Sequence, residues 1–156
     1  MPNIGELLGD HRLKAAGIAR ERHLDSGEIV IQEGSDDRVV YLIQRGCVRV
    51  TERVELEDRR HIQPGICDLG ANEVFGELSL FDPGPRMATV MTLEPCDLLV
   101  FDARALASYF DRQPDFGYQV LKELFRVLSS RLRQTDRRVG ALFAWGLKAH
   151  GIDKHL

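Results

Sequence analysis

Short apolar segments closed by glycine constrain the fold of this chain more than any other feature. Between Gly27 and Phe101, runs rich in Val, Ile and Leu alternate with turn residues, and no long helical pattern separates them. The predicted strands cover residues 28–32, 39–43, 47–51, 90–93 and 97–101. Many short strands with glycine at their ends are typical of an antiparallel sandwich or jelly roll.

Residues 52–69 alternate poorly and contain Pro64-Gly65, and we interpret them as a long hairpin. Its tip lies either near Glu57-Asp58 or near Pro64-Gly65. Periodicity does not choose between the two positions.

Helical patterns are predicted on both sides of the strands. Residues 4–24 carry spaced apolar residues among charges, which predicts one or two short amphipathic helices. Asp102 is a good N-cap for a helix over 103–112, and Pro114 ends that helix and can begin the next. The chain is therefore predicted to be α+β, an antiparallel β-roll or jelly roll flanked by N-terminal helices and a long C-terminal helix.

The long C-terminal helix is expected from about Asp115 to Leu147. Its apolar positions alternate spacings of four and three, as in a coiled-coil seam: Leu121, Phe125, Leu128, Leu132, Thr135, Val139 and Leu142. Such a helix would be longer than the β-roll on which it packs, which favours a homodimer formed through its second half. The alternative is a loose tail. Thr135, the polar residue of the seam, is either a core threonine or a hydroxyl available to a ligand.

Composition limits the class of protein. A length of 156 residues fits a single domain, divided into 1–24 (N-terminal helices), 25–101 (β-roll), 102–148 (C-terminal helices) and 149–156 (tail). A net charge of -3 disfavours nucleic acid and anionic membranes, although the C-terminal part is basic, which we interpret as a solvated face. Three widely spaced cysteines without a C-x-x-C motif indicate a reducing compartment and argue against disulfides or zinc. With no signal peptide or membrane span in the sequence, a soluble cytoplasmic protein is expected.

The segment Phe75–Val90 is a candidate anion site. Gly76-Glu77 opens a short helical turn whose free N–H groups can face an anion, and Arg86 returns a cation to the same place after a Pro/Gly loop. Glu77 would repel a bare phosphate. A carboxylate there fits a ligand that also donates hydroxyls, such as a sugar phosphate.

The order of strands, F-G-E-L-S-L, a short loop, P-R-M-A-T-V, two strands and two helices resembles the cyclic-nucleotide-binding domain. The sequence R-L-R-Q-T-D-R-R-V-G-A-L-F resembles the dimerisation helix of the bacterial cyclic-AMP receptor protein (CRP/FNR) family. The resemblance covers roughly residues 24–147 and makes 75–90 the phosphate-binding cassette, a name kept below. Asn72 departs from the family's glycine, a tolerable change because Asn adopts the left-handed conformation.

The resemblance implies a cyclic 3′,5′-nucleotide with its phosphate on Arg86 and on backbone N–H groups, and its ribose 2′-OH on Glu77 and Gly76. The predicted ligand-binding residues are Gly76, Glu77, Leu78, Ser79, Arg86, Met87, Ala88 and Thr135. No metal or cofactor is expected.

The residues expected near the base favour cyclic AMP over cyclic GMP. Cyclic-GMP sites of this family often place Thr after the arginine, whereas this chain has Met87, which hydrogen-bonds poorly. In the receptor proteins a Thr-Ser pair reaches adenine, its second residue coming from the partner subunit. This chain has Thr135 and then Asp136, which could accept from the amine or face solvent. Phe143 or Trp145 could cap the base or belong to the seam.

The sequence thus predicts a stand-alone cyclic-AMP sensor, in which the ligand moves the C-terminal helix and biases a dimer or an unknown protein effector. No DNA-binding module is expected, because only Phe143 to Leu156 follow the family-like helix. The alternatives are a ligand-free structural or dimerisation module, or a sensor of cyclic GMP or a cyclic dinucleotide. An enzyme of the cupin type is not expected, since His61 is the only histidine between residues 24 and 149.

Overall fold

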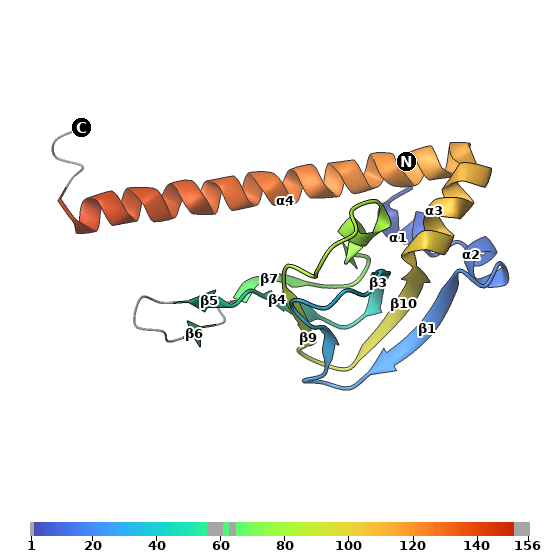
Figure 1. Cartoon of the computed structure of the whole chain (residues 1–156), viewed down its shortest axis with the longest axis horizontal. Helices are drawn as coiled ribbons and strands as arrows, with labels where there is room; N and C mark the ends of the chain where they lie inside the picture. Colours follow the sequence, from blue (N-terminus) through green and yellow to red (C-terminus); the bar gives the residue numbers. More distant parts are fainter. Residues whose placement is uncertain (1, 56–60, 63–64, 152–156) are drawn as a thin grey trace. The chain divides into compact units, whose positions relative to one another are not determined.

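The structure is a computed structural model that describes residues 2–55, 61–62 and 65–151 (Figure 1). The chain forms two units, Met1–Val120 and Leu121–Leu156. The helices are α1 (Ile4–Leu8), α2 (His11–Ala15), the 3-10 helix η1 (Glu77–Leu80), α3 (Ala103–Arg112) and α4 (Pro114–Ala149). The strands are β1 (Ala19–Leu24), β2 (Ile29–Ile31), β3 (Val39–Arg45), β4 (Val48–Thr51), β5 (Val54–Glu55), β6 (His61–Ile62), β7 (Gly65–Leu69), β8 (Val74–Phe75), β9 (Thr89–Thr92) and β10 (Cys96–Asp102).

The first unit is an antiparallel β-roll, as predicted. One four-stranded sheet has the order β1-β10-β3-β8 and the other β2-β9-β4-β7, and β5 pairs with β6 as a separate ladder. Of the two predicted hairpin tips, Glu57-Asp58 lies outside the described residues, and Gly65 of the other begins β7. Strands far apart in sequence, such as β1 and β10, are therefore neighbours in space (Figure 1).

The core lies between the two sheets. Its buried side chains come from both of them and include Leu24, Ile31, Tyr41, Ile43, Val48, Leu69, Phe75, Val90, Leu98 and Val100. Tyr41 and Phe75 stack with ring centroids 4.9 Å apart. Side chains alternate along a strand, so the neighbours of these core residues in β3 and β10 lie on the opposite face of the first sheet. They are also buried there: Val40, Leu42, Leu99 and Phe101.

Helices account for that second buried face. Helix α1 contacts β3, α2 contacts β1, and α3 contacts both β10 and η1. Their fully buried leucines are Leu8, Leu13 and Leu106. This double burial explains the nearly continuous apolar runs of β3 and β10, which alternation alone would not give.

The prediction of helix over residues 4–24 was wrong for its last part. Residues 19–24 form strand β1, which pairs with β10 along its whole length from Ala19 to Leu24. Only these two terminal residues are buried, so β1 carries no alternating apolar pattern. Backbone hydrogen bonding to β10, rather than side-chain periodicity, makes this segment a strand.

The C-terminal helices begin where the sequence predicts. The Asp102 carboxylate accepts a hydrogen bond of 2.8 Å from Ala105 N, and α4 starts at Pro114. Helices α3 and α4 meet closely at Gly117, where a Cβ atom would lie 2.7 Å from Phe110 Cβ. Asn72 adopts the left-handed conformation with φ 67°, so the departure from glycine is accommodated.

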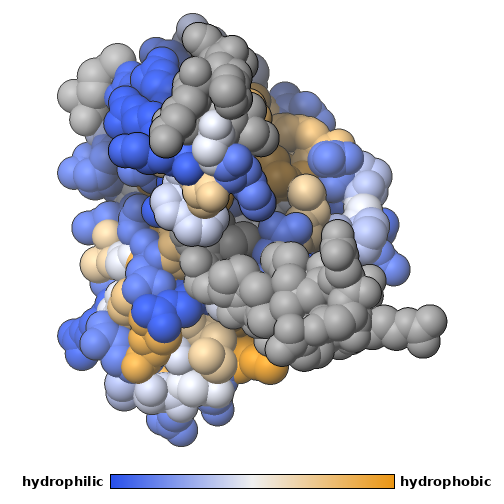
Figure 2. Space-filling model, turned by 90° about the vertical axis from the view of Figure 1, so that its left-hand side faces the viewer, coloured by the Kyte–Doolittle hydropathy of each residue, from blue (hydrophilic) through white to orange (hydrophobic). Residues whose placement is uncertain are grey.

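The surface is mostly hydrophilic on the face that Figure 2 shows, with apolar residues in small patches. Among the described residues no helix is long and apolar enough to cross a membrane.

Candidate functional site

The cassette begins with a left-handed residue. Strand β8 ends at Phe75, and Gly76 then turns with φ 75° into η1. A Cβ atom on Gly76 would lie 2.9 Å from Val39 O and 3.1 Å from Arg86 Nη1. Glycine is therefore required here both for the backbone conformation and for the close approach of the arginine.

Arg86 is the centre of the cassette, with only 9% of its surface exposed. Its Nε donates to Asp37 Oδ1 at 2.7 Å, and Nη2 donates to Asp37 Oδ2 at 3.3 Å and to Val39 O at 2.5 Å. Its Nη1 donates to Ser79 Oγ at 2.5 Å and to Gly76 O at 3.2 Å. These five bonds equal the number of guanidinium N–H groups, so each of these groups has an acceptor within the chain.

Asp37 is the partner that sequence analysis missed. Its carboxylate lies in the β2–β3 loop, and the hydrogen bond from Arg86 holds its pKa below the usual range. The backbone strengthens this link, because Arg86 N donates to Ser35 O and Gly34 N donates to Arg86 O. In the sequence, Asp37 is recognisable only as an aspartate that lies just before a strand. This pattern is too common to single out one residue.

Arg38, also missed, supports the cassette from another direction. Its guanidinium donates to Ser79 O at 3.0 Å and to Leu80 O at 3.2 Å, the last carbonyls of η1. Carbonyls at a helix end need such donors, since no further turn supplies them. Two consecutive loop residues thus hold the cassette. Asp37 binds Arg86 of the cassette, and Arg38 binds the end of its helix η1.

The remaining predicted cassette residues divide into buried and exposed. Glu77 is buried at 9% exposure and Ala88 is half-buried, whereas Leu78 and Met87 are exposed at 53% and 74%. The structure therefore gathers Gly76, Ser79 and Arg86 by direct hydrogen bonds and leaves two apolar side chains on the surface of the same segment.

Thr135 belongs to the second unit, where it is exposed and its hydroxyl donates to Arg131 O at 3.0 Å. A threonine that bonds the preceding turn of its own helix has an internally satisfied donor. Its predicted contact with a ligand stays a prediction.

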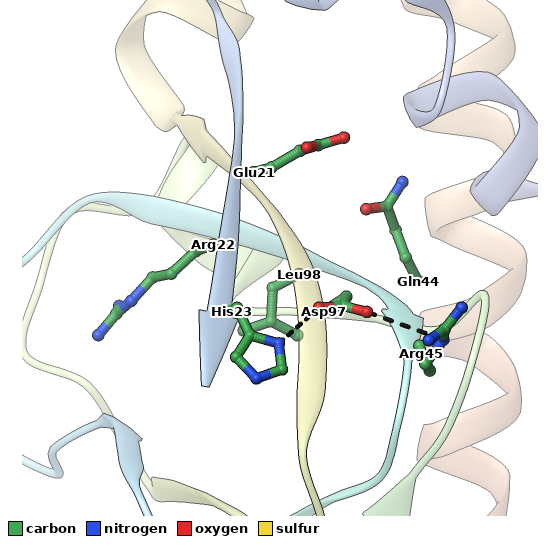
Figure 3. Close-up of a pocket in the computed structure, with 7 residues that line it drawn as sticks. All are labelled: Glu21, Arg22, His23, Gln44, Arg45, Asp97 and Leu98. Carbon is green, nitrogen blue, oxygen red and sulfur yellow. Dashed lines mark hydrogen bonds and ion pairs between the residues drawn. The ribbon is translucent and has the colours of Figure 1, made fainter. Parts of the chain in front are cut away.

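A separate polar cavity of about 440 Å³ lies over the end of the first sheet (Figure 3). Asp97 of β10 stands between His23 of β1 and Arg45 of β3, with His23 Nδ1 2.7 Å from Asp97 Oδ1 and Arg45 Nε 3.7 Å from Asp97 Oδ2. The strand register, which pairs both residues with Asp97, brings the three together. The Asp97 hydrogen bond raises the pKa of His23.

Within the described part of the chain, no group of three or more His, Cys, Asp or Glu residues could hold a metal ion. The cysteines Cys47, Cys67 and Cys96 are free thiols.

Comparison with known proteins assigns the fold and the cassette to a family. The family model described as "Cyclic nucleotide-binding domain" matches residues 21–113, a range that contains most of β1, all of β2–β10, α3 and the cassette. The chain belongs to the cyclic nucleotide-binding domain family. The expected fold class and the resemblance are thereby confirmed.

Two relatives are named as a regulator and a receptor. A CRP-like cAMP-activated global transcriptional regulator of Mycobacterium tuberculosis is 33% identical over 116 residues, which are 74% of this chain and 48% of the relative. The Cyclic AMP receptor protein of Thermus thermophilus is 28% identical over 82% of this chain and 56% of its own length. The chain thus spans about half the length of the curated relatives it matches.

Solved structures show the same fold. The Thermus thermophilus Catabolite Activator Protein superimposes with a TM-score of 0.68 at 25% identity, over 89% of this chain and 62% of that one. A cyclic nucleotide-binding domain from Methylobacillus flagellatus gives a TM-score of 0.70 at 25% identity, over 81% of this chain and 68% of its own.

Proposed function

We propose that this protein is a cytoplasmic sensor whose cassette binds cyclic AMP, and that the ligand biases a homodimer or an unidentified effector protein through α4. The single observation that carries the proposal is the Arg86 guanidinium, buried and aligned with Gly76 O and Ser79 Oγ of η1. A buried cation beside the start of a short helix suits a phosphate, with charged hydrogen bonds worth about 1.5–3 kcal/mol each.

Phosphate binding requires exchange, because all five guanidinium N–H groups already have acceptors. Ser79 is the easiest partner to replace, since its hydroxyl can turn and donate to the phosphate instead. The two hydrogen bonds to Asp37 then stay in place on Nε and Nη2, and the Nη1 N–H that Ser79 releases donates to the phosphate while the other stays on Gly76 O. Glu77, buried in the same helix, would accept the ribose 2′-OH.

The preference for cyclic AMP rests on Met87 and on the names of relatives. Met87 follows Arg86 and is exposed, so it offers guanine no hydrogen bond and leaves an apolar contact for adenine. The Mycobacterium tuberculosis and Thermus thermophilus relatives are named for cyclic AMP. Leu78, Ala88 and Thr135 remain proposed ligand contacts, and the single-domain organisation over 1–156 remains our proposal.

A second candidate is a structural module of the same fold that binds no ligand. The saturation of Arg86 favours it, because an arginine with five internal acceptors is also what a structural ion pair requires. The two candidates differ in whether a nucleotide can replace an internal acceptor.

Thermal unfolding with cyclic AMP, cyclic GMP or a cyclic dinucleotide separates them. A ligand at one hundred times its Kd stabilises the folded state by about 2.7 kcal/mol. Arg86→Leu should remove the shift. Arg49→Leu is the matched control, because it breaks an exposed two-bond pair with Asp68 outside the cassette and should keep the shift. A wild-type protein that responds to none of the three nucleotides is the structural module.

A further inference from the structure

The two units of the chain carry opposite charge. Residues 1–120 contain 13 Lys and Arg against 21 Asp and Glu, a net charge of -8. Residues 121–156 contain 8 Lys and Arg against 3 Asp and Glu, a net charge of +5. The net charge of -3 for the whole chain therefore hides a strongly basic second unit. Such an asymmetry between two parts of one chain points to an anionic partner for the basic part.

Most basic residues of α4 lie on one face of the helix. Because an α-helix turns by about 100° per residue, five exposed cations fall within about 80° of arc: Lys122, Arg126, Arg133, Arg137 and Lys148. We call these five residues the basic stripe. The other residues of that arc between 122 and 148 are Ser130, Gly140 and Ala144, so the arc contains no acidic side chain. The long cationic side chains therefore extend from this face beside small, uncharged neighbours.

The basic stripe is separate from the apolar seam of the same helix. Arg133 and Arg137 lie between about 100° and 160° around the helix from Leu132 and Val139. These two seam residues are 62% and 60% exposed. A contact made through the stripe therefore leaves the seam available for the self-association included in the proposed function.

The shape of the basic stripe suits a flat anionic partner. Its five cations extend along about 39 Å of a straight helix (Figure 1). A plane of anionic lipid headgroups can meet all five at once, whereas the phosphates of duplex nucleic acid follow a helical path that leaves a straight row after a few contacts. Each Lys or Arg near an anionic membrane adds to the attraction, which falls off within a Debye length.

We propose that the basic stripe docks the second unit on an anionic lipid surface, with α4 lying along the headgroups. The basic C-terminal part, which the sequence alone suggested was a solvated face, is then a binding surface. This inference goes beyond the proposed function, because it assigns the protein a place of action at a membrane. It does not depend on whether the cassette binds a nucleotide.

Co-sedimentation of the full chain with vesicles, with no nucleotide present, tests the docking. Phosphatidylcholine vesicles that contain about 30% phosphatidylserine should bind the protein at about 0.05 M salt and release it at about 0.5 M, because the attraction is electrostatic. Vesicles of phosphatidylcholine alone should not bind it. Arg133→Gln/Arg137→Gln removes two cations of the stripe but keeps good helix formers, and unchanged circular dichroism would show that the helix persists. This variant should bind the anionic vesicles about thirtyfold more weakly, since each Lys or Arg near such a surface contributes about fivefold.

The matched control is Arg131→Gln/Arg138→Gln, which removes the same charge from α4 at positions about 100–160° around the helix from Arg133 and Arg137. It should weaken vesicle binding by less than about threefold, because these residues lie off the stripe. Equal losses from the two variants would overturn the stripe as the binding surface. Binding to neutral vesicles at high salt would overturn it in favour of the apolar seam. A wild-type chain that leaves the anionic vesicles unbound, or binds duplex DNA instead of them, overturns the docking itself. Since the assay contains no nucleotide, each result is independent of whether the cassette binds cyclic AMP.

Discussion

Asp37 and Arg86, 49 residues apart in the sequence, form a two-bond ion pair with Oδ1 2.7 Å from Nε and Oδ2 3.3 Å from Nη2. The arginine side chain is 7% exposed and the aspartate side chain 37%. The carboxylate thus partly neutralises a buried cation from the solvent side. It also fixes the plane of the guanidinium, which sets where Nη1 points.

Asp37→Asn should lower the affinity for cyclic AMP about tenfold, because losing a charged hydrogen bond of about 1.5 kcal/mol lets the guanidinium turn away. Calorimetric titration measures the change, and Asp36→Asn is the control, since Asp36 is an exposed neighbour. A variant that binds more tightly than wild type would show that Asp37 competes with the phosphate instead of orienting its arginine.

Gly76→Ala should both destabilise the protein and abolish nucleotide binding. The left-handed backbone costs a residue with a Cβ about 1–2 kcal/mol, and the added atom would press on Val39 O and displace Arg86 Nη1. Gly84→Ala is the control within the cassette, because a Cβ there meets nothing within 4 Å. Melting temperature and ligand titration report the two effects separately. An alanine variant with wild-type affinity would contradict the placement of Arg86 against Gly76.

His23 should titrate above its ordinary pKa of 6.5, chiefly because of its hydrogen bond to Asp97 and further because of the charges of Asp97, Asp25 and Glu28. Since the folded-state pKa is raised, the pair's contribution to the free energy of unfolding is fully present below pH 6.5 and is lost as pH rises through the raised value. NMR titration of the imidazole follows this directly. Asp97→Asn should lower the pKa of His23 more than Asp25→Asn does, because the Asp25 carboxylate lies 3.7 Å from Nε2. Equal effects would rule out the 2.7 Å bond as the main cause.

Gly117→Ala should destabilise the first unit by about 1–3 kcal/mol, because the added Cβ would lie 2.7 Å from Phe110 Cβ and 3.1 Å from its Cα. Gly140→Ala lies in the same helix with no atom within 4 Å and should leave the melting temperature unchanged or raise it slightly, since alanine favours helix. Chemical denaturation of both variants makes the comparison. Equal stability of the two would mean that the helices do not cross closely at Gly117.

The sequence predicted those features that depend on local chemistry. Asp102 caps α3, Pro114 begins α4, and Gly76-Glu77 opens a short helix, because capping, proline geometry and left-handed turns each act within a few residues. Strand β1 escaped prediction because its identity comes from pairing with β10, more than seventy residues away, and its side chains carry no pattern.

The same distinction holds for the site. Arg86 and Glu77 were found because they share one short motif, whereas Asp37 and Arg38 join the cassette only after β3 has paired with β8 and β10. A single sequence gives no sign of which loop aspartate will meet a distant arginine. The partners of a buried charge are a product of tertiary structure, even when the charge itself is recognisable.

Arg38 also accepts a hydrogen bond of 3.1 Å from Ala103 N through its own carbonyl, at the residue where α3 begins. One residue therefore joins the cassette helix to the start of the C-terminal helices, next to the residue that orients Arg86. The length of the β2–β3 loop is therefore constrained at these two residues. Inserting one amino acid between Asp37 and Arg38, or deleting either of them, would disrupt these attachments, so changes in loop length should be tolerated elsewhere on the surface but not here.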